Sequence, residues 1–108
     1  MENPNQKDFE WIRISPAING IYQRLLISAR GGTEKFIKFE KNADYPLHHH
    51  PDRHEWIYVI EGQITVNVDE KIRTLNPGEY EDFPVNSNHS LKAGDKGAVV
   101  LVSAFNTT

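Results

Sequence analysis

Residues 55–75 read Glu-Trp-Ile-Tyr-Val-Ile-Glu-Gly-Gln-Ile-Thr-Val-Asn-Val-Asp-Glu-Lys-Ile-Arg-Thr-Leu. β-Branched and aromatic residues are frequent in it, and apolar and polar side chains alternate from Ile64 to Val68. A period of two is typical of a strand with one buried face. Glu61-Gly62 and Asp69-Glu70 interrupt the apolar runs with turn-forming residues. The stretch therefore predicts three consecutive β-strands joined by short turns.

The same rhythm continues in both directions along the chain. Short apolar runs alternate with turn chemistry such as Asn76-Pro77-Gly78, and a turn recurs about every ten residues. No window combines helical periodicity with helix start and stop signals. We expect an all-β sandwich or barrel in a single domain over residues 9–108, after a flexible segment at 1–8. The expected strands are 9–14, 21–28, 35–39, 55–60, 63–68, 71–75, 80–83, 89–92 and 98–105.

Charge and cysteine content restrict the partners and the site chemistry. The 108 residues include 12 Lys and Arg against 15 Asp and Glu, a net charge of −3. A mildly acidic surface repels phosphate backbones, so we expect no nucleic-acid partner. No stretch approaches the ~18 apolar residues of a membrane span, and the first residues lack a secretion signal, so we expect a cytoplasmic protein. Cysteine is absent, which leaves histidine nitrogen and carboxylate oxygen as metal ligands.

Histidine is concentrated in one segment. Four of the five histidines lie within residues 48–54, and the fifth is His89. Successive side chains of a strand point to opposite faces. In an extended segment His48 and His50 would therefore share one face, and His49 would point the other way.

Glu55 lies two and four residues before Ile57 and Val59, so its side chain is on the same face of the strand as theirs. It therefore faces the interior if they do. An isolated buried carboxylate is very costly, and a divalent cation would compensate its charge. His89 has the parity of Leu91 and can supply a further ligand from a remote strand. The predicted ligands are His48, His50, Glu55 and His89. Two simpler interpretations stay open: a surface cluster of histidines beside a glutamate, and a hydrogen-bonded core histidine at position 89.

Two segments resemble the sequence motifs of the cupin superfamily. The first motif, G-x5-H-x-H-x(3,4)-E-x6-G, matches at His48, His50, Glu55 and Gly62. The second motif, G-x5-P-x-G-x2-H-x3-N, matches at Gly78, Pro84 and His89. Matches of this order and spacing across residues 42–93 make the resemblance specific and favour the metal site over the simpler interpretations.

Three positions depart from the two motifs. Asn42 and Asn86 stand where the motifs have glycine, and Ala93 stands where the second has asparagine. Asparagine tolerates left-handed backbone angles better than most residues, so the first two changes are mild. Ala93 removes a polar side chain from the end of the second motif. None of the three is a predicted ligand.

The resemblance implies a double-stranded β-helix, or jelly-roll, barrel with one divalent transition metal near its mouth. Three imidazoles and a carboxylate suit Fe, Mn, Ni, Co, Cu or Zn, and the spacing does not select among them. It also implies three possible functions. They are a dioxygenase-like enzyme acting on a small organic substrate, with Glu55 as both ligand and catalytic base; a non-catalytic module that binds or senses a metal or small ligand; and a sugar isomerase or epimerase.

The residues expected to face inward favour a small hydrophobic or aromatic ligand over a sugar. They are Ile57, Val59, Ile64, Val66, Phe83 and Leu91. Tyr22, Phe36, Tyr80 and Phe83 are candidates for the wall of the barrel.

Because successive side chains of a strand point to opposite faces, His49 and His54 are expected to point away from the neighbouring predicted ligands and to be rim or surface residues. Trp56, Tyr58 and Ile60 form an apolar outer face. We expect it to be covered by a second subunit in a homodimer, or by the N-terminal run around Phe9 and Trp11.

Overall fold

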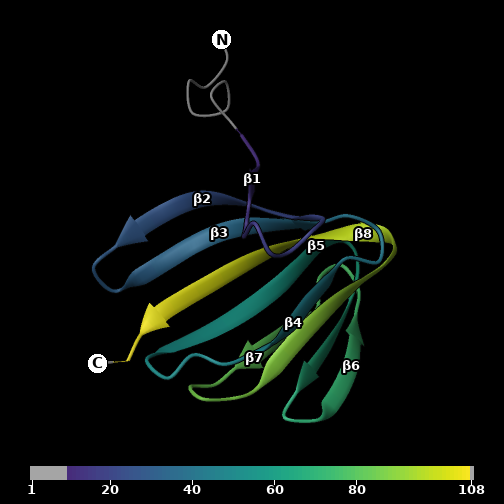
Figure 1. Ribbon diagram of the computed structural model, residues 1–108. Coiled ribbons are helices and arrows are strands. Elements are labelled where there is room, and N and C mark those ends of the chain that lie inside the picture. The colour runs from purple at the N-terminus through teal and green to yellow at the C-terminus, as the bar shows by residue number, and fades with distance from the viewer. Residues whose placement is uncertain (1–9, 108) are drawn as a thin grey trace.

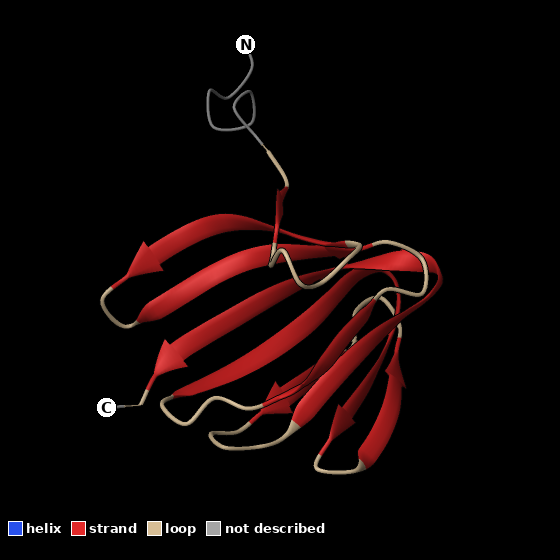
Figure 2. Cartoon of the chain, viewed as in Figure 1, coloured by secondary structure: helices blue, strands red, loops and turns tan. Residues whose placement is uncertain are grey.

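The computed structural model describes residues 10–107, which form antiparallel strands joined by turns and loops (Figure 1). The described residues contain no helix (Figure 2) and so none that could span a membrane. The all-β prediction is confirmed, whereas the predictions for residues 1–8 and Phe9 fall outside the described part of the chain. The strands are β1 (Ile12–Arg13), β2 (Ile21–Ala29), β3 (Gly32–Phe39), β4 (Asp44–His48), β5 (Arg53–Val68), β6 (Lys71–Leu75), β7 (Tyr80–Phe83) and β8 (His89–Asn106).

Two long strands, β5 and β8, give the sheet its shape because they pair with each other twice. Residues 53–62 of β5 pair with 98–106 of β8, and residues 64–68 pair with 89–93. The first stretch is extended by β3, β2 and β1 on one side and by β7 on the other. The second is flanked by β4 and β6. Figure 1 shows the strands curling into two layers that face each other, the jelly-roll arrangement expected from the sequence.

Both long strands bend where the sequence predicted them to end. The register of β5 against β8 shifts on either side of Gly62, as in a β-bulge. Gly62 and Gly97 have φ values of 78° and 74°, in the left-handed region that glycine adopts without strain. A Cβ on Gly62 would lie 2.1 Å from the carbonyl oxygen of Gly97. The predicted strand breaks at Glu61-Gly62 and at 93–97 are therefore wrong, because each strand continues through its bend into the other layer.

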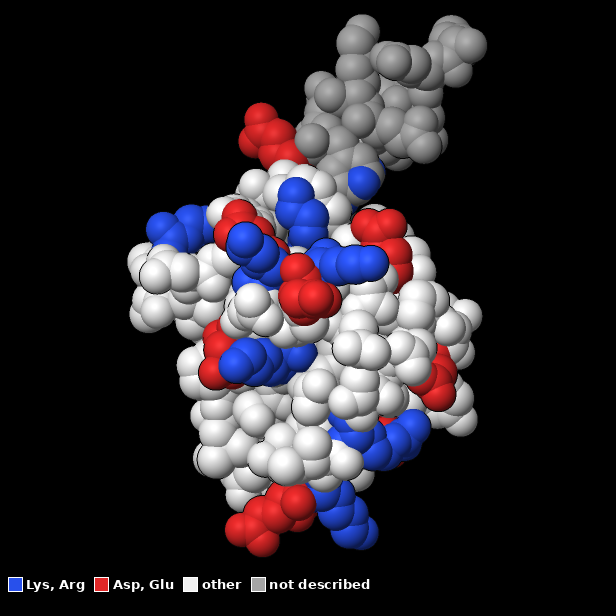
Figure 3. All heavy atoms as spheres, turned by 90° about the vertical axis from the view of Figure 1, so that its right-hand side faces the viewer, with Lys and Arg blue, Asp and Glu red and all other residues white. Residues whose placement is uncertain are grey.

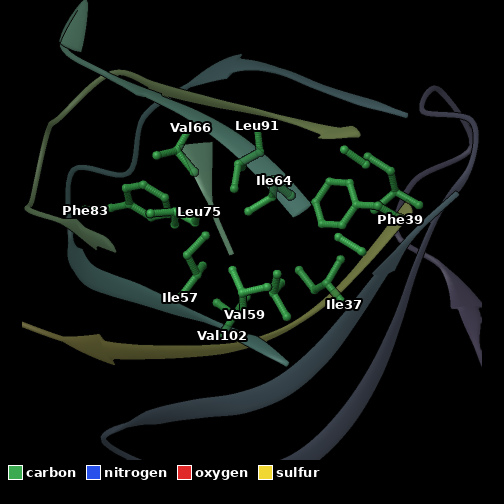
Figure 4. Close-up of a cluster of buried hydrophobic side chains, with 14 residues drawn as sticks. Ile37, Phe39, Ile57, Val59, Ile64, Val66, Leu75, Phe83, Leu91 and Val102 are labelled. Carbon is green, nitrogen blue, oxygen red and sulfur yellow. The ribbon is translucent and has the colours of Figure 1, made fainter. Parts of the chain in front are cut away.

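The core fills the space between the two layers. In Figure 4 the labelled side chains from both layers point toward a common centre. The six residues predicted to face inward are all buried, with at most 8% of their surface exposed. Strand parity therefore predicted the core correctly.

The two asparagines that replace motif glycines adopt the backbone conformation expected of them. The φ angle is 58° at Asn42 and 65° at Asn86. Ala93, the third departure, is buried and donates its N–H to the carbonyl of Ala43 at 3.0 Å. A methyl group at this position thus packs into the core, and the corner stays closed.

Charged side chains are mixed over the surface. On the face shown in Figure 3, basic and acidic groups are interspersed, in keeping with the small net charge. Near the N-terminal end, Lys38 lies over the rings of Trp11 and Tyr22, with Nζ 5.0 Å and 5.7 Å from the ring centroids. Trp11 thus contacts β3.

Candidate metal centre

Three imidazole rings converge at one end of the barrel. His48 is the last residue of β4 and pairs with His89, the first residue of β8. His50 lies in the loop between β4 and β5. One ring nitrogen from each of the three lies within 4.8 Å of the other two. The premise that His50 belongs to a strand is wrong, since β4 ends at His48, but the prediction that these rings come together is confirmed.

Backbone carbonyls fix the tautomer of two of the rings. Nδ1 of His48 lies 2.7 Å from the carbonyl oxygen of Pro46, and Nδ1 of His89 lies 3.1 Å from that of Ser87. Because a carbonyl oxygen only accepts, each Nδ1 must carry the proton and donate it. In the neutral form of each ring the lone pair is therefore on Nε2, the atom that is then available to a metal.

The turn before β8 holds both His89 and the loop of His50. Ser87 is buried, and its N–H and its hydroxyl both donate to the carbonyl of Pro84. Asn86, in the left-handed conformation, donates its N–H to the carbonyl of His50 at 3.0 Å. The ring of Phe83 stacks on His89 with centroids 4.4 Å apart. The loop histidine is thus fixed by a hydrogen bond to a turn remote in sequence.

Glu55 lies beside the three rings. Its Oε1 is 3.0 Å from Nε2 of His50 and 3.8 Å from Nε2 of His89. Nη2 of Arg53 lies close to both nitrogens of the same ring, 3.1 Å from Nδ1 and 3.3 Å from Nε2. Since arginine only donates and a carboxylate only accepts, Nδ1 of His50 accepts from Arg53 and Nε2–H donates to Glu55. A cation at this Nε2 would replace that proton.

A small cavity connects these groups with the core. Its free volume is about 50 Å³, room for roughly three to five water molecules. Its wall combines eight apolar residues with seven polar or charged ones. The lining residues include Lys35, Ile37, Phe39, Tyr45, His48, His50, Arg53, Glu55, Ile57, Phe83, His89, Leu91, Val100 and Val102.

Of the four aromatic residues predicted for the wall, only Phe83 lines this cavity. Tyr80 is 64% exposed, and Tyr22 donates its hydroxyl to Glu40. Phe36 is half-buried on the other face of β3 from the lining residue Ile37.

Sequence reasoning missed two cationic residues of the cavity, Lys35 and Arg53. The spacing along the strands could have indicated both. Lys35 has the parity of the buried Ile37 on β3, and Arg53 has the parity of Glu55 on β5. Burial is the main influence on Lys35 and lowers its pKa, Arg53 lowers it further, and Glu55 raises it. The pKa of Tyr45 is raised, mainly by burial.

Burial also lowers the pKa of two of the site histidines. It lowers the pKa of His50, with Glu55 opposing and Arg53 reinforcing the effect. His89 is only 3% exposed, and burial, reinforced by His48, lowers its pKa from 6.5 to about 4. Between these two pH values the unfolded chain binds a proton that the folded chain rejects, so stability falls as pH falls.

We expect the metal-free protein to lose about 2 kcal/mol of unfolding free energy between pH 7 and pH 5 through His89. Urea unfolding at the two pH values measures this loss. A His89→Asn variant controls for the carboxylates, and its unfolding free energy should change less over the same interval. Equal pH dependence of the two chains would contradict the prediction.

The remaining two histidines point away from the cavity. His49 is exposed. His54 is hydrogen-bonded through Nε2 to the carboxylate of Asp82 and stacks on Phe105, with ring centroids 5.1 Å apart. Neither lines the cavity, which agrees with their predicted place at the rim or surface.

The donor set fits a transition metal. Borderline metals prefer imidazole nitrogen with a carboxylate oxygen, and two of the rings already have Nδ1 committed to a carbonyl, as metal-binding histidines usually do. His48, His50 and His89 could hold the cation. Glu55 is adjacent, and its role as the fourth ligand stays a prediction.

Comparison with known proteins bears on the fold and the family. Quercetin 2,3-dioxygenase from Bacillus subtilis (strain 168) is 35% identical over 52 residues, which are 48% of this chain but only 15% of that protein. The structure of KdgF from Halomonas sp. aligns with a TM-score of 0.83 and 22% identity, over 96% of this chain and 90% of that one.

An RmlC-like cupin from Shewanella frigidimarina aligns with a TM-score of 0.80 and 25% identity, over 94% of this chain and 86% of the other. Residues 35–105, which are more than half of the chain, match the sequence family of the cupin domain. With the same barrel in the structure and both motifs in the sequence, the chain belongs to the cupin family.

Proposed function

We propose that this cupin binds one divalent transition metal through His48, His50, His89 and Glu55 and catalyses a dioxygenase-like reaction on a small organic substrate. The observation that carries the proposal is the convergence of three imidazoles and a carboxylate on one cavity. The local similarity to quercetin 2,3-dioxygenase supports the reaction class. The small free volume argues against a substrate as large as a flavonol.

The residues that line the cavity would have separate roles in this reaction. When bound, a redox-active cation would polarise a substrate oxygen and supply electrons toward O₂. Glu55, within 3.0 Å of His50, is the one carboxylate that lines the cavity among the described residues, so it would accept a proton from the substrate. Phe39, Ile57 and Val102 line the wall and keep water from the reacting atoms.

A sugar isomerase or epimerase fits this cavity less well. A polyhydroxylated substrate needs hydrogen-bond partners along its length, and eight of the fifteen lining residues are apolar. A binding or sensing module uses the same ligands without turnover, so only a kinetic experiment separates it from an enzyme.

The test is elemental analysis followed by oxygen uptake. Protein purified without added metal or a nickel column should contain about one transition metal ion per chain. The Fe(II) form should then consume O₂ in a screen of small enolic, phenolic and carboxylic compounds. A Glu55→Gln variant that keeps its metal should lose most of this uptake. Stoichiometric metal without uptake for any compound would favour the binding module, and absence of metal would refute both.

We also propose a homodimer through the outer face of β5. Tyr58, Ile60 and Tyr80 are 40%, 42% and 64% exposed, and Trp56, Tyr58, Tyr80 and Asp82 line an open groove there. Apolar area of this kind is usually covered by a partner. Light scattering at micromolar concentration should give twice the 12.4 kDa chain mass, and Tyr58→Lys should shift the protein toward monomer. A strict monomer would remove this proposal.

A further inference from the structure

Two cationic side chains line the cavity without a carboxylate partner. Among the ion pairs of residues 10–107, none involves Lys35 or Arg53. Lys35 donates from Nζ to Oε1 of Gln23 at 3.1 Å, and Arg53 donates from Nη2 to His50. Both side chains belong to the wall that also contains the three imidazoles.

Arg53 in particular keeps an unused donor. Its Nε is buried and has no hydrogen-bond partner among the described residues. Leaving a buried donor unsatisfied is costly, and most such groups have a partner. A ligand in the cavity can supply the missing acceptor.

The charge of the cavity defines that ligand. Glu55 is the one acidic residue of the wall, against Lys35 and Arg53. A divalent cation at the imidazoles would add further positive charge in a poorly hydrated space, where charges interact strongly. An anion compensates this excess, whereas a neutral polyol does not.

The positions of the two cations suit a short ligand. Lys35 lies on β3 and Arg53 on β5, on either side of β8, and each precedes an inward-facing residue by two positions. With a free volume of about 50 Å³, the cavity that both residues line admits a few heavy atoms. Ile37, Phe39 and Val100 would contact the apolar part of such a ligand.

We propose that the substrate is a small organic anion, a carboxylate or enolate, and that Lys35 and Arg53 bind its negative charge and so determine specificity. This inference rests on the proposed function, because it assigns the substrate class of the same site.

Acetate and acetamide form a matched pair of probes, because they have nearly the same shape and differ in charge. Dissociation constants are measured by saturation-transfer NMR with Co(II)-loaded and with metal-free protein. The variants are Lys35→Gln, Arg53→Gln and the control Lys71→Gln, which removes an exposed charge on β6. Their affinity for Co(II) is measured separately.

Acetate should bind at least about tenfold more tightly than acetamide, because a hydrogen bond to a charged group stabilises more than one to a neutral group. Lys35→Gln and Arg53→Gln should each raise the dissociation constant for acetate by about tenfold. Lys71→Gln should leave it unchanged, and the dissociation constant for acetamide should be the same in all variants. The same ranking is expected without metal, with weaker affinities.

Equal acetate affinity in wild type and both cavity variants, or no preference over acetamide, overturns the inference even if Co(II) binds normally. Failure of wild type to bind Co(II) refutes the proposed function instead. In that case the acetate affinities of the metal-free variants still test whether Lys35 and Arg53 bind the anion.

Discussion

Replacing His50 with alanine should lower the affinity for a divalent transition metal by two orders of magnitude or more. Loss of second-sphere partners alone typically costs ~10–100-fold in metal affinity, so loss of a ligand should cost at least as much. Nε2 of His50 lies next to Glu55 and the other two rings. Competition with a chromophoric chelator, using Co(II) or Zn(II), measures the change.

His49 provides a control of the same residue type one position away. It is exposed and does not line the cavity, so His49→Ala should change metal affinity by less than about threefold. Circular dichroism of both variants checks that the fold is retained. Comparable losses in the two variants would mean that the metal is held by a surface cluster of histidines, and the proposed centre would be wrong.

The second large effect is expected at Gly62, where alanine should lower the unfolding free energy by about 3 kcal/mol or more. The new Cβ would meet the Gly97 carbonyl at 2.1 Å and Cα of Ala98 at 2.7 Å. A φ of 78° adds strain for any residue with a side chain. Since whole domains are stable by only ~5–15 kcal/mol, the loss is large. Urea unfolding of the metal-free protein measures it.

Gly31→Ala is the matched control for this substitution. A Cβ at Gly31 has nothing within 4 Å, so its effect should stay within about 0.5 kcal/mol. If Gly62→Ala unfolds at the same urea concentration as wild type, the bend of β5 can move to a neighbouring residue. The pairing of β5 in both layers would then not depend on glycine at position 62.

The core was predictable because strand parity depends only on local alternation. Ile57, Val59, Ile64 and Val66 are buried as the pattern indicates. Strand ends were less predictable. Gly62 looks like a turn in sequence, but whether a glycine ends a strand or bends it depends on the partner strand, which lies far along the chain.

The residues of the candidate site were predictable, but the hydrogen bonds that hold them in place were less so. The spacing of His48, His50 and Glu55 indicated ligands, and the structure brings all three together with His89. The hydrogen bond from Asn86 to the carbonyl of His50 depends on two segments meeting in space, so no local pattern could predict it.

The place of β8 in the sheet has a consequence for synthesis. β3, β4 and β5 all pair with β8, yet among the described strands the ribosome makes it last. Until it emerges, the nascent chain exposes unpaired edges on three strands, a state prone to aggregation. Co-translational folding of the barrel must therefore wait for β8, which also brings His89 to the imidazoles of His48 and His50.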